Sequence, residues 1–150
     1  MKLTWADVDW ICLNLASQIK DSKFKPDMIL GVARGGLIPA TILATLLDIK
    51  DVISISIRSY TKNRKRKNAP EYLHSLPKKL ILGKQILVVD DIVDSGNTLK
   101  SLDELISPDL ALAMYATLFA KSKAKFRPHF IGYEITKSNE WTIWPWETDK

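Results

Sequence analysis

The chain has 150 residues, of which 46% are hydrophobic and 26% charged, and its formal net charge at pH 7 is +5. This length and composition are those of one globular domain with a sizeable core, and no apolar run approaches the roughly 18 residues of a membrane-spanning helix. Cys12 is the sole cysteine, which excludes an internal disulfide and a cysteine-based zinc site. Asp7 and Asp9 stand where a signal peptide would be apolar, so we expect a cytoplasmic protein.

The first helix is predicted from a start signal and from helical spacing. Thr4 followed by Asp7 is typical of a helix start. The apolar residues that we expect on one face of this helix are Trp5, Val8, Ile11, Leu15 and Ile19. Residues 28–32 (MILGV) then predict a short buried strand, and residues 33–36 (ARGG) a turn. Residues 37–48 predict a second helix with Pro39 in its first turn, where proline is tolerated.

The remainder of the chain alternates strands with other segments. Further strands are predicted over 52–57, 85–90, 112–120 and 129–135, and a helix from Asn97 or Thr98 through Ile106. Residues 59–80 are polar, basic and interrupted by prolines, so we expect a long loop there, with at most a short helix around Glu71. This alternation predicts an α/β fold with a largely parallel sheet, in which ligands bind beyond the carboxyl ends of the strands.

One strand end carries a turn that is suited to phosphate. Ser95-Gly96-Asn97-Thr98 lies between the buried strand at 85–90 and a predicted helix. A glycine turn at a helix start leaves backbone N–H groups free to bind an anion, and hydroxyl groups add further donors. The segment is neither a Walker A loop nor G-x-G-x-x-G. A helix cap with a tight turn is the alternative interpretation of these four residues.

Three acids at the same strand end make a ligand site the better interpretation. Asp90 and Asp91 are adjacent carboxylates, which repel one another unless a cation or hydrogen-bond donors lie between them. Mg²⁺ or a pair of sugar hydroxyls would meet that need. Asp94 lies at the edge of the turn, where it could act as a general base. Arg34-Gly35-Gly36, after the strand at 28–32, adds a forked donor for phosphate oxygens and a backbone that can approach a ligand closely.

These residues carry a family resemblance. VVDDIVDSGNT, residues 88–98, resembles the phosphoribosyl-pyrophosphate signature of type I phosphoribosyltransferases: two apolar residues, two acids, two or three spacers and then Asp-Ser/Thr-Gly-x-Thr. ARGG resembles the pyrophosphate loop of that family, with Ala33 where a serine is expected. Arg58-Ser59-Tyr60 resembles the start of the flexible loop that closes over the substrates.

The resemblance extends to the C-terminal part of the chain. Phe119-Ala120-Lys121 is similar to a strand end of bacterial xanthine-guanine phosphoribosyltransferases, whose lysine contacts the 6-oxo group of the purine. Residues 141–147, WTIWPWE, resemble the hood of these enzymes, with Thr142 in place of an aliphatic residue. We expect the ring of Trp141 to stack on the base, and Trp144 and Trp146 to belong to the hydrophobic core.

The resemblance implies a fold and an activity. It implies one phosphoribosyltransferase domain over 1–150, with a lid loop at about 59–75 and a small purine hood at about 134–150. The implied activity is purine salvage: transfer of the 5-phosphoribosyl group from phosphoribosyl pyrophosphate to guanine, xanthine or hypoxanthine, with Mg²⁺ as cofactor. The products are the nucleoside 5′-monophosphate and pyrophosphate. The implied assembly is a homodimer or homotetramer, without a membrane or nucleic-acid partner.

The resemblance also assigns roles to single residues. Asp90 and Asp91 would hold the ribose hydroxyls or the metal and act in catalysis together with Asp94. The remaining assignments are the 5′-phosphate to Asp94, Ser95, Gly96, Asn97 and Thr98; pyrophosphate to Arg34, Gly35 and Gly36; the lid to Arg58, Ser59 and Tyr60; and the purine to Lys121, Trp141, Thr142 and Glu147.

Two alternatives stay open at this point. The chain could be a phosphoribosyltransferase for adenine or a pyrimidine, although the segments around Lys121 and Trp141 favour a 6-oxopurine. It could instead be a nucleotide-sensing regulator of the same fold that binds nucleic acid. The basic tract KNRKRK, residues 62–67, is the one feature that favours a regulator. The same tract fits a solvated loop or a lid that meets a polyanionic substrate.

Overall fold

A six-stranded sheet forms the centre of the protein. The structure is a computed structural model that describes residues 1–60, 66–137 and 141–147, with only the backbone for 59, 60 and 66–68. The strands are β1 (Met28–Ala33), β2 (Asp51–Tyr60), β3 (Arg66–Tyr72), β4 (Gln85–Val93), β5 (Leu112–Lys121) and β6 (Phe130–Ile135), in the spatial order β3-β2-β1-β4-β5-β6. Only the β2–β3 pair is antiparallel. The predicted α/β fold with a largely parallel sheet is therefore confirmed.

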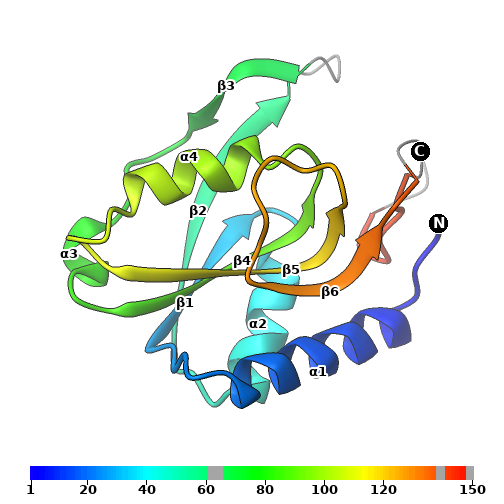
Figure 1. The fold of residues 1–150 in the computed structure, drawn as a ribbon, viewed down its shortest axis with the longest axis horizontal. Coiled ribbons are helices and arrows are strands. Elements are labelled where there is room, and N and C mark those ends of the chain that lie inside the picture. Colours follow the sequence, from blue (N-terminus) through cyan, green and yellow to red (C-terminus); the bar gives the residue numbers. More distant parts are fainter. Residues whose placement is uncertain (61–65, 138–140, 148–150) are drawn as a thin grey trace.

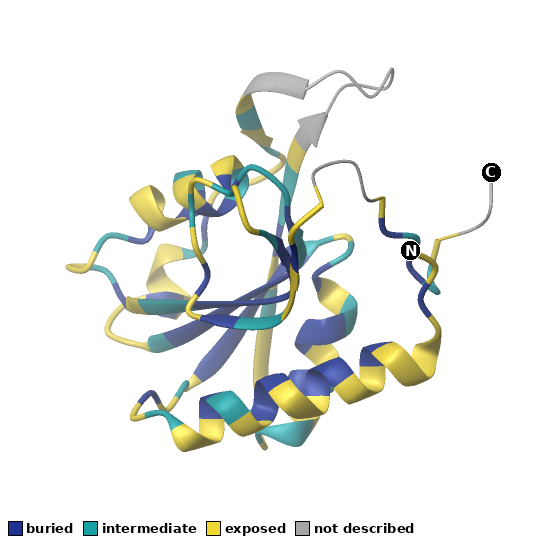
Figure 2. Cartoon of the chain, turned by 45° about the vertical axis from the view of Figure 1, so that its right-hand side comes forward, coloured by how far each residue is buried: buried dark blue, intermediate teal, exposed yellow. Residues whose placement is uncertain are grey.

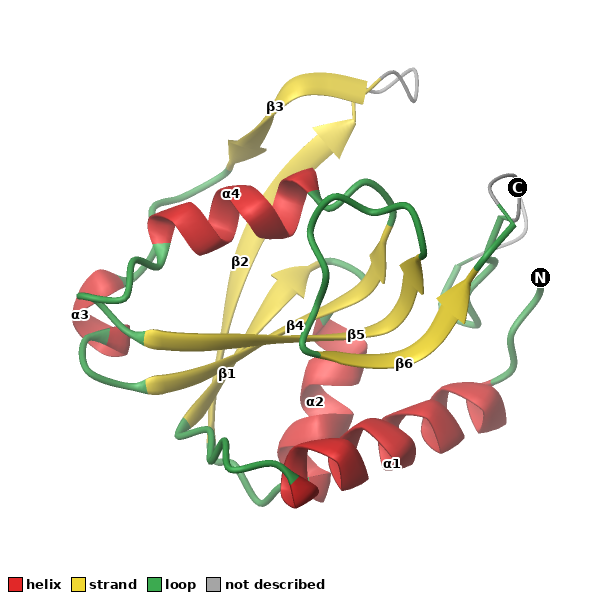
Figure 3. Ribbon diagram, in the orientation of Figure 1, coloured by secondary structure: helices red, strands yellow, loops and turns green. Residues whose placement is uncertain are grey.

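Helices cover both faces of the sheet (Figure 1). Helices α1 (Trp5–Asp21) and α2 (Leu37–Leu46) lie on one face, while α3 (Lys78–Ile81) and α4 (Asn97–Leu105) lie on the other (Figure 3). The strand β4 serves both layers, because Leu87 and Val89 pack toward α1 and α2, whereas Ile86 and Val88 pack toward α4. Figure 2 shows the central strands buried beneath the helices. Among the described residues, no helix has both the length and the apolar character needed to cross a membrane.

The start of α1 agrees with its sequence signal. Thr4 Oγ1 accepts a hydrogen bond from the Asp7 backbone N–H at 3.2 Å, and Asp7 Oδ2 accepts from the Thr4 backbone N–H at 2.7 Å. This reciprocal pair satisfies two donors that the first turn of a helix leaves unpaired. Four of the residues expected on one face of this helix are buried: Val8, Ile11, Leu15 and Ile19. Trp5 is 54% exposed, and its ring lies 6.0 Å from that of Trp146.

The expected long loop over 59–80 is the main error of the sequence prediction. Within it, β3 runs from Arg66 to Tyr72 and pairs antiparallel with β2, so that Glu71 lies opposite Arg58 rather than in a short helix. The helix that the described residues of this region contain is α3, which begins seven residues after Glu71. Pro70 suggested a loop, but β3 is an edge strand, where proline and charged residues are tolerated.

The order of the strands determines where a ligand binds. Strands β1 and β4 are neighbours, yet the chain leaves β1 toward α2 on one face and leaves β4 toward α4 on the other. Such a switch point opens a crevice beyond the carboxyl ends of the two strands. The segments 33–36 and 94–98, which the sequence singled out separately, follow these two strand ends.

Candidate active site

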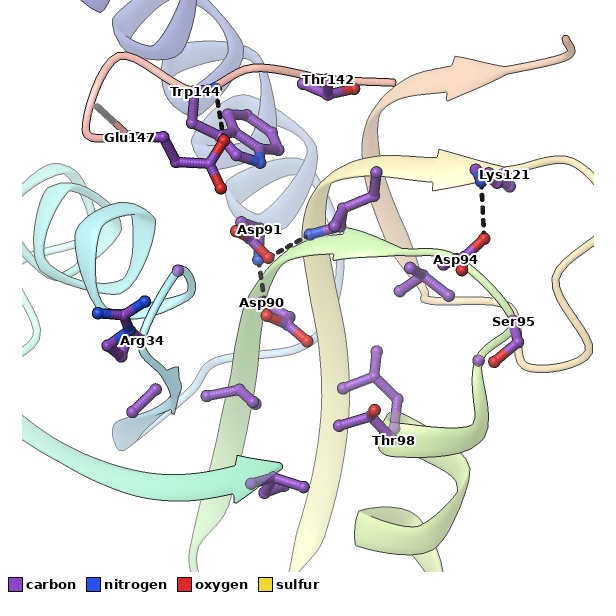
Figure 4. Close-up of a pocket in the computed structure, with 18 of the residues that line it drawn as sticks. Arg34, Asp90, Asp91, Asp94, Ser95, Thr98, Lys121, Thr142, Trp144 and Glu147 are labelled. Atoms are coloured by element: carbon purple, nitrogen blue, oxygen red, sulfur yellow. Dashed lines mark hydrogen bonds and ion pairs between the residues drawn. The ribbon is translucent and has the colours of Figure 1, made fainter. Parts of the chain in front are cut away.

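A cavity of about 370 Å³ lies at the carboxyl ends of the central strands (Figure 4). Segments far apart in the sequence line it: the turn after β1, the end of β4 with the turn that follows, and a C-terminal segment that covers it, together with Ile57 of β2 and Lys121 of β5. Its lining includes Arg34, Gly35, Asp90, Asp91, Asp94, Ser95, Gly96, Thr98, Lys121, Trp141, Thr142, Trp144 and Glu147. Most of the predicted site residues are thus brought together around one cavity.

The turn after β1 lies directly against the end of β4. A Cβ atom on Gly36 would lie 2.5 Å from the Val89 carbonyl oxygen and 2.6 Å from that of Val32, so only glycine fits this approach. Gly35 lies against the Asp91 carboxylate, and the preceding Ala33–Arg34 peptide bond is cis. The turn therefore presents Arg34 and its own backbone to the cavity beside the two acids of β4.

Asp90 and Asp91 lie inside β4, because this strand continues to Val93 instead of ending at Asp90 as expected. Asp90 Oδ1 accepts a hydrogen bond from the Asp91 N–H at 2.9 Å, and Asp91 Oδ1 accepts from the Ile92 N–H at 2.8 Å. Burial, and then the charge of Asp91, raises the pKa of Asp90 well above its usual range. Burial also raises the pKa of Asp91, and the charge of Glu147 adds to this effect.

The two buried acids fit a cation that arrives with a substrate. Among the described residues, no three His, Cys, Asp or Glu side chains are grouped so as to hold a metal ion. Mg²⁺ commonly binds through one or two carboxylates, with substrate phosphates and water as its other ligands. Asp90 and Asp91 match that donor set, because a positive charge beside them would relieve the cost of ionising both.

The turn after β4, residues 94–98, is the candidate anion cradle and lies at the start of α4. Gly96 has φ +86°, a left-handed conformation that favours glycine, and the Asn97 N–H donates to Ser95 Oγ at 3.3 Å. Gly96 precedes the first residue of α4, so the first helical turn, where a helix offers backbone N–H groups to an anion, begins beside Ser95 and Thr98, and both of these residues line the cavity. Asn97 begins the helix but is not part of the cavity lining.

An ion pair joins two predicted site residues, one in the turn after β4 and one at the end of β5. Lys121 Nζ, at the end of β5, lies 2.8 Å from Asp94 Oδ1 (Figure 4). The side chain of Lys121 is 23% exposed and that of Asp94 is 43% exposed. Solvent therefore screens the ion pair, and a ligand can replace it at a small cost in free energy. The arrangement presents one cation and one carboxylate side by side at the edge of the cavity.

The C-terminal segment covers the cavity and is fixed from two sides. Trp144 is buried as expected, and Trp146 stacks on it with ring centroids 4.8 Å apart. Glu147 Oε2 accepts from the Trp144 N–H at 3.2 Å. Residue Ile143 forms a parallel bridge with Lys2, so that the first residues of the chain run beside the hood.

Two hood residues differ in their surroundings. Trp141 lines the edge of the cavity and is 70% exposed. Thr142 is 6% exposed, and within the described part of the chain its Oγ1 has no hydrogen-bond partner. A buried hydroxyl without a partner costs about 1–3 kcal/mol relative to a satisfied one.

The structure describes the side chain of one predicted lid residue, Arg58, which lies in β2 outside the cavity lining. The side chains of Ser59 and Tyr60, and residues 62–65 of the basic tract, lie outside the described residues. Ile57 lines the cavity but was missed. It belongs to a strand of alternating Ile and Ser, and nothing local distinguishes it from the core isoleucines of that strand.

The chain is similar to purine phosphoribosyltransferases in sequence and in fold. The family described as phosphoribosyl transferase domain matches residues 6–149. A xanthine-guanine phosphoribosyltransferase of Cereibacter sphaeroides is 37% identical over 121 residues, which cover 79% of this chain and 68% of the relative. A solved purine phosphoribosyltransferase of Pyrococcus horikoshii has a TM-score of 0.82 at 32% identity, and the match covers 100% of this chain and 95% of that structure. A Helicobacter pylori xanthine-guanine-hypoxanthine phosphoribosyltransferase has a TM-score of 0.77 at 29% identity, and the match covers 97% of this chain and 92% of that structure.

Proposed function

The chain belongs to the phosphoribosyl transferase domain family, and from this premise we propose that it salvages purines by transferring a 5-phosphoribosyl group from phosphoribosyl pyrophosphate to a 6-oxopurine. The observation that carries the proposal is the meeting, around one cavity, of an anion cradle, a buried acid pair and the Asp94–Lys121 pair beneath a hood. The products are the nucleoside 5′-monophosphate and pyrophosphate.

The two phosphate-bearing ends of the substrate bind at opposite sides of the cavity. The 5′-phosphate is held by backbone N–H groups of residues 94–98 and by the Ser95 and Thr98 hydroxyls, which the start of α4 favours as an anion site. Pyrophosphate is held by Arg34 and by the backbone of residues 34–36. This division is supported by the position of the two loops after β1 and β4, on either side of the acid pair.

Asp90 and Asp91 hold the ribose. Their carboxylates accept hydrogen bonds from the ribose hydroxyls, directly or through Mg²⁺ that enters with the substrate. When bound, the metal supplies positive charge that neutralises the departing pyrophosphate. As that group leaves, C1′ gains oxocarbenium character, which the nearby carboxylates stabilise electrostatically.

The base binds between Asp94, Lys121 and the hood. A 6-oxopurine presents an acceptor at O6 next to N7, which matches an ammonium beside a carboxylate. Lys121 donates to O6, and Asp94 accepts a proton from the base near N7 while N9 attacks C1′. Trp141 stacks on the base, and Thr142 and Glu147 border its other edge. Adenine carries an amino donor in place of O6 and is disfavoured by the Lys121 charge.

Several features of the whole protein belong to the same proposal. Residues 1–150 act as one domain, in which residues 59–75, beginning at Arg58-Ser59-Tyr60, close over the substrates and exclude water. The protein is cytoplasmic and assembles as a homodimer or homotetramer. Trp10 and Leu13 support an assembly, because they expose large apolar side chains on α1.

A panel of bases tests the proposed function. Protein, Mg²⁺ and phosphoribosyl pyrophosphate are incubated separately with guanine, xanthine, hypoxanthine, adenine, orotate and uracil, and nucleotides are separated by chromatography. We expect a 5′-monophosphate from at least one 6-oxopurine, and loss of that product when EDTA replaces Mg²⁺. The absence of any nucleotide in all six reactions would refute the enzyme assignment, while product from adenine or a pyrimidine alone would refute the base class.

Replacing Lys121 by Ala tests how the base is recognised. A hydrogen bond to a charged group contributes roughly 1.5–3 kcal/mol, so kcat/KM for the 6-oxopurine should fall roughly 10- to 150-fold. The rate with adenine should not fall, and the preference for 6-oxopurines should shrink. Lys123→Ala is the matched control, since Lys123 is an exposed lysine two residues along the chain and outside the cavity lining. An unchanged preference in Lys121→Ala would remove the O6 assignment.

A further inference from the structure

The loop between β5 and β6 lies across the anion cradle. The Lys125 N–H donates to the Ser95 carbonyl oxygen at 2.9 Å. A Cβ atom on Gly96 would lie 2.5 Å from the Phe126 nitrogen, so the backbone of the loop touches the backbone of the cradle. In Figure 1 this loop arches toward the start of α4 before it descends into β6. The cradle thus faces the cavity on one side and residues 125–126 on the other.

An aromatic anchor fixes this loop to the core. The Phe126 ring meets the ring of Tyr115 edge-on, with centroids 4.9 Å apart and planes at 78°. Tyr115 is fully buried in β5, within the same apolar cluster as Leu99 of α4. At its far end the loop is fixed again, because His129 donates its backbone N–H to the Tyr115 carbonyl at 2.9 Å and accepts the Tyr115 N–H through Nδ1 at 3.1 Å.

The near end of the loop starts in the base site. The Ala124 N–H donates to the Lys121 carbonyl oxygen at 3.0 Å, and the next two residues, Lys125 and Phe126, contact Ser95 and Gly96. The short segment 121–126 therefore connects the side chain that pairs with Asp94 to the backbone that supports Ser95. Phe126 is not part of the cavity lining, and its backbone nitrogen is what a Cβ atom on Gly96 would approach most closely.

We propose that Phe126 is a positioning residue for the 5′-phosphate cradle, through its contact with Gly96 and through the Lys125–Ser95 hydrogen bond. The inference rests on the proposed function of the cradle. An anion site built from backbone N–H groups depends on the orientation of those groups, and Gly96, at φ +86°, is free to turn away once its support is removed. Phe126 keeps the cradle in its binding geometry before the substrate arrives.

Phe126→Ala tests this role against a matched core variant. Phe24→Ala removes a buried phenylalanine whose ring stacks on that of Phe130, with centroids 6.5 Å apart, outside the cavity lining. We expect Phe126→Ala to raise KM for phosphoribosyl pyrophosphate and Kd for GMP roughly 10- to 100-fold, with KM for the base much less affected. Phe24→Ala should lower the melting temperature without this change, and Phe126→Leu should restore most of the affinity.

A backbone variant covers the case in which Phe126→Ala does not fold. Lys125→Pro removes the N–H that Ser95 accepts, whereas Lys125→Ala keeps it. A rise in KM for phosphoribosyl pyrophosphate in Lys125→Pro but not in Lys125→Ala supports the inference. If the wild type is active but neither Phe126→Ala nor Lys125→Pro changes that KM, the positioning role is refuted. If the wild type makes no nucleotide from any base, the proposed function itself has failed.

Discussion

Replacing Asp94 by Asn should lower kcat for the 6-oxopurine by roughly 10²–10⁴-fold, the usual loss when one general base is removed. Asn has nearly the same shape and can still accept a hydrogen bond, but it cannot take a proton from the base. The Lys121 ammonium, 2.8 Å from Asp94 in the ligand-free protein, would lose its ionic partner. Because that pair is partly exposed to solvent, its loss should change KM for the base far less than kcat.

Steady-state kinetics of Asp94→Asn separates these effects. If Asp94 is the base, kcat should fall in the variant while KM for the base and for phosphoribosyl pyrophosphate stays close to the wild-type value. Asp109→Asn is the control, since it changes an exposed acid that lies outside the cavity lining. Near-normal kcat in Asp94→Asn, with intact substrate binding, would contradict the general-base assignment.

The parts of the fold that depend on local signals could be predicted from the sequence. The Thr4–Asp7 capping pair spans four residues and forms as expected. The apolar run at 85–90 indicated a strand buried on both faces, and β4 contributes to both core layers. The glycine turns after β1 and after β4 were predicted from the same kind of signal, in which glycines follow a strand and precede a helix.

The errors lie where a partner far away in the chain decides the outcome. Strand β3 forms because it pairs with the edge of β2. Its own sequence, with Pro70 and several charged residues, does not indicate a strand. Trp5 has the helical spacing of a core residue, but it lies beside Trp146 at the surface.

Phe126 was missed for the same reason. Its neighbours Gly96 and Tyr115 are distant in sequence, and nothing in the composition of residues 122–129 marks a loop that touches a ligand site. The residues that the resemblance identified carry chemistry themselves, whereas Phe126 matters through the backbone that it supports. A resemblance of motifs therefore identifies the residues that contact a ligand more readily than the residues that position those contacts.

Replacing Gly36 by Ala should damage both stability and pyrophosphate binding, and two opposing effects decide the size of the change. Gly36 has φ −67° and ψ −14°, so Ala adopts its backbone without strain, and the stiffer unfolded chain alone would stabilise the fold by about 0.4–1 kcal/mol. Against this, the added Cβ would lie 2.5 Å from the Val89 oxygen and 2.9 Å from the Asp90 Cα. These are backbone atoms of β4 that cannot rotate away.

Overpacking of this kind costs about 1–3 kcal/mol, so the steric effect should exceed the gain and the melting temperature should fall. The turn would also move away from β4 and carry Arg34 with it, and a shift of about 1 Å can cost roughly 10²-fold in kcat/KM for phosphoribosyl pyrophosphate. Gly83→Ala is the control, because Gly83 has φ +73° and open space around its Cβ position. It should lower the melting temperature through backbone strain alone and leave kcat/KM unchanged. A Gly36→Ala protein with a raised melting temperature and unchanged kinetics would show that the turn does not need its close contact with β4.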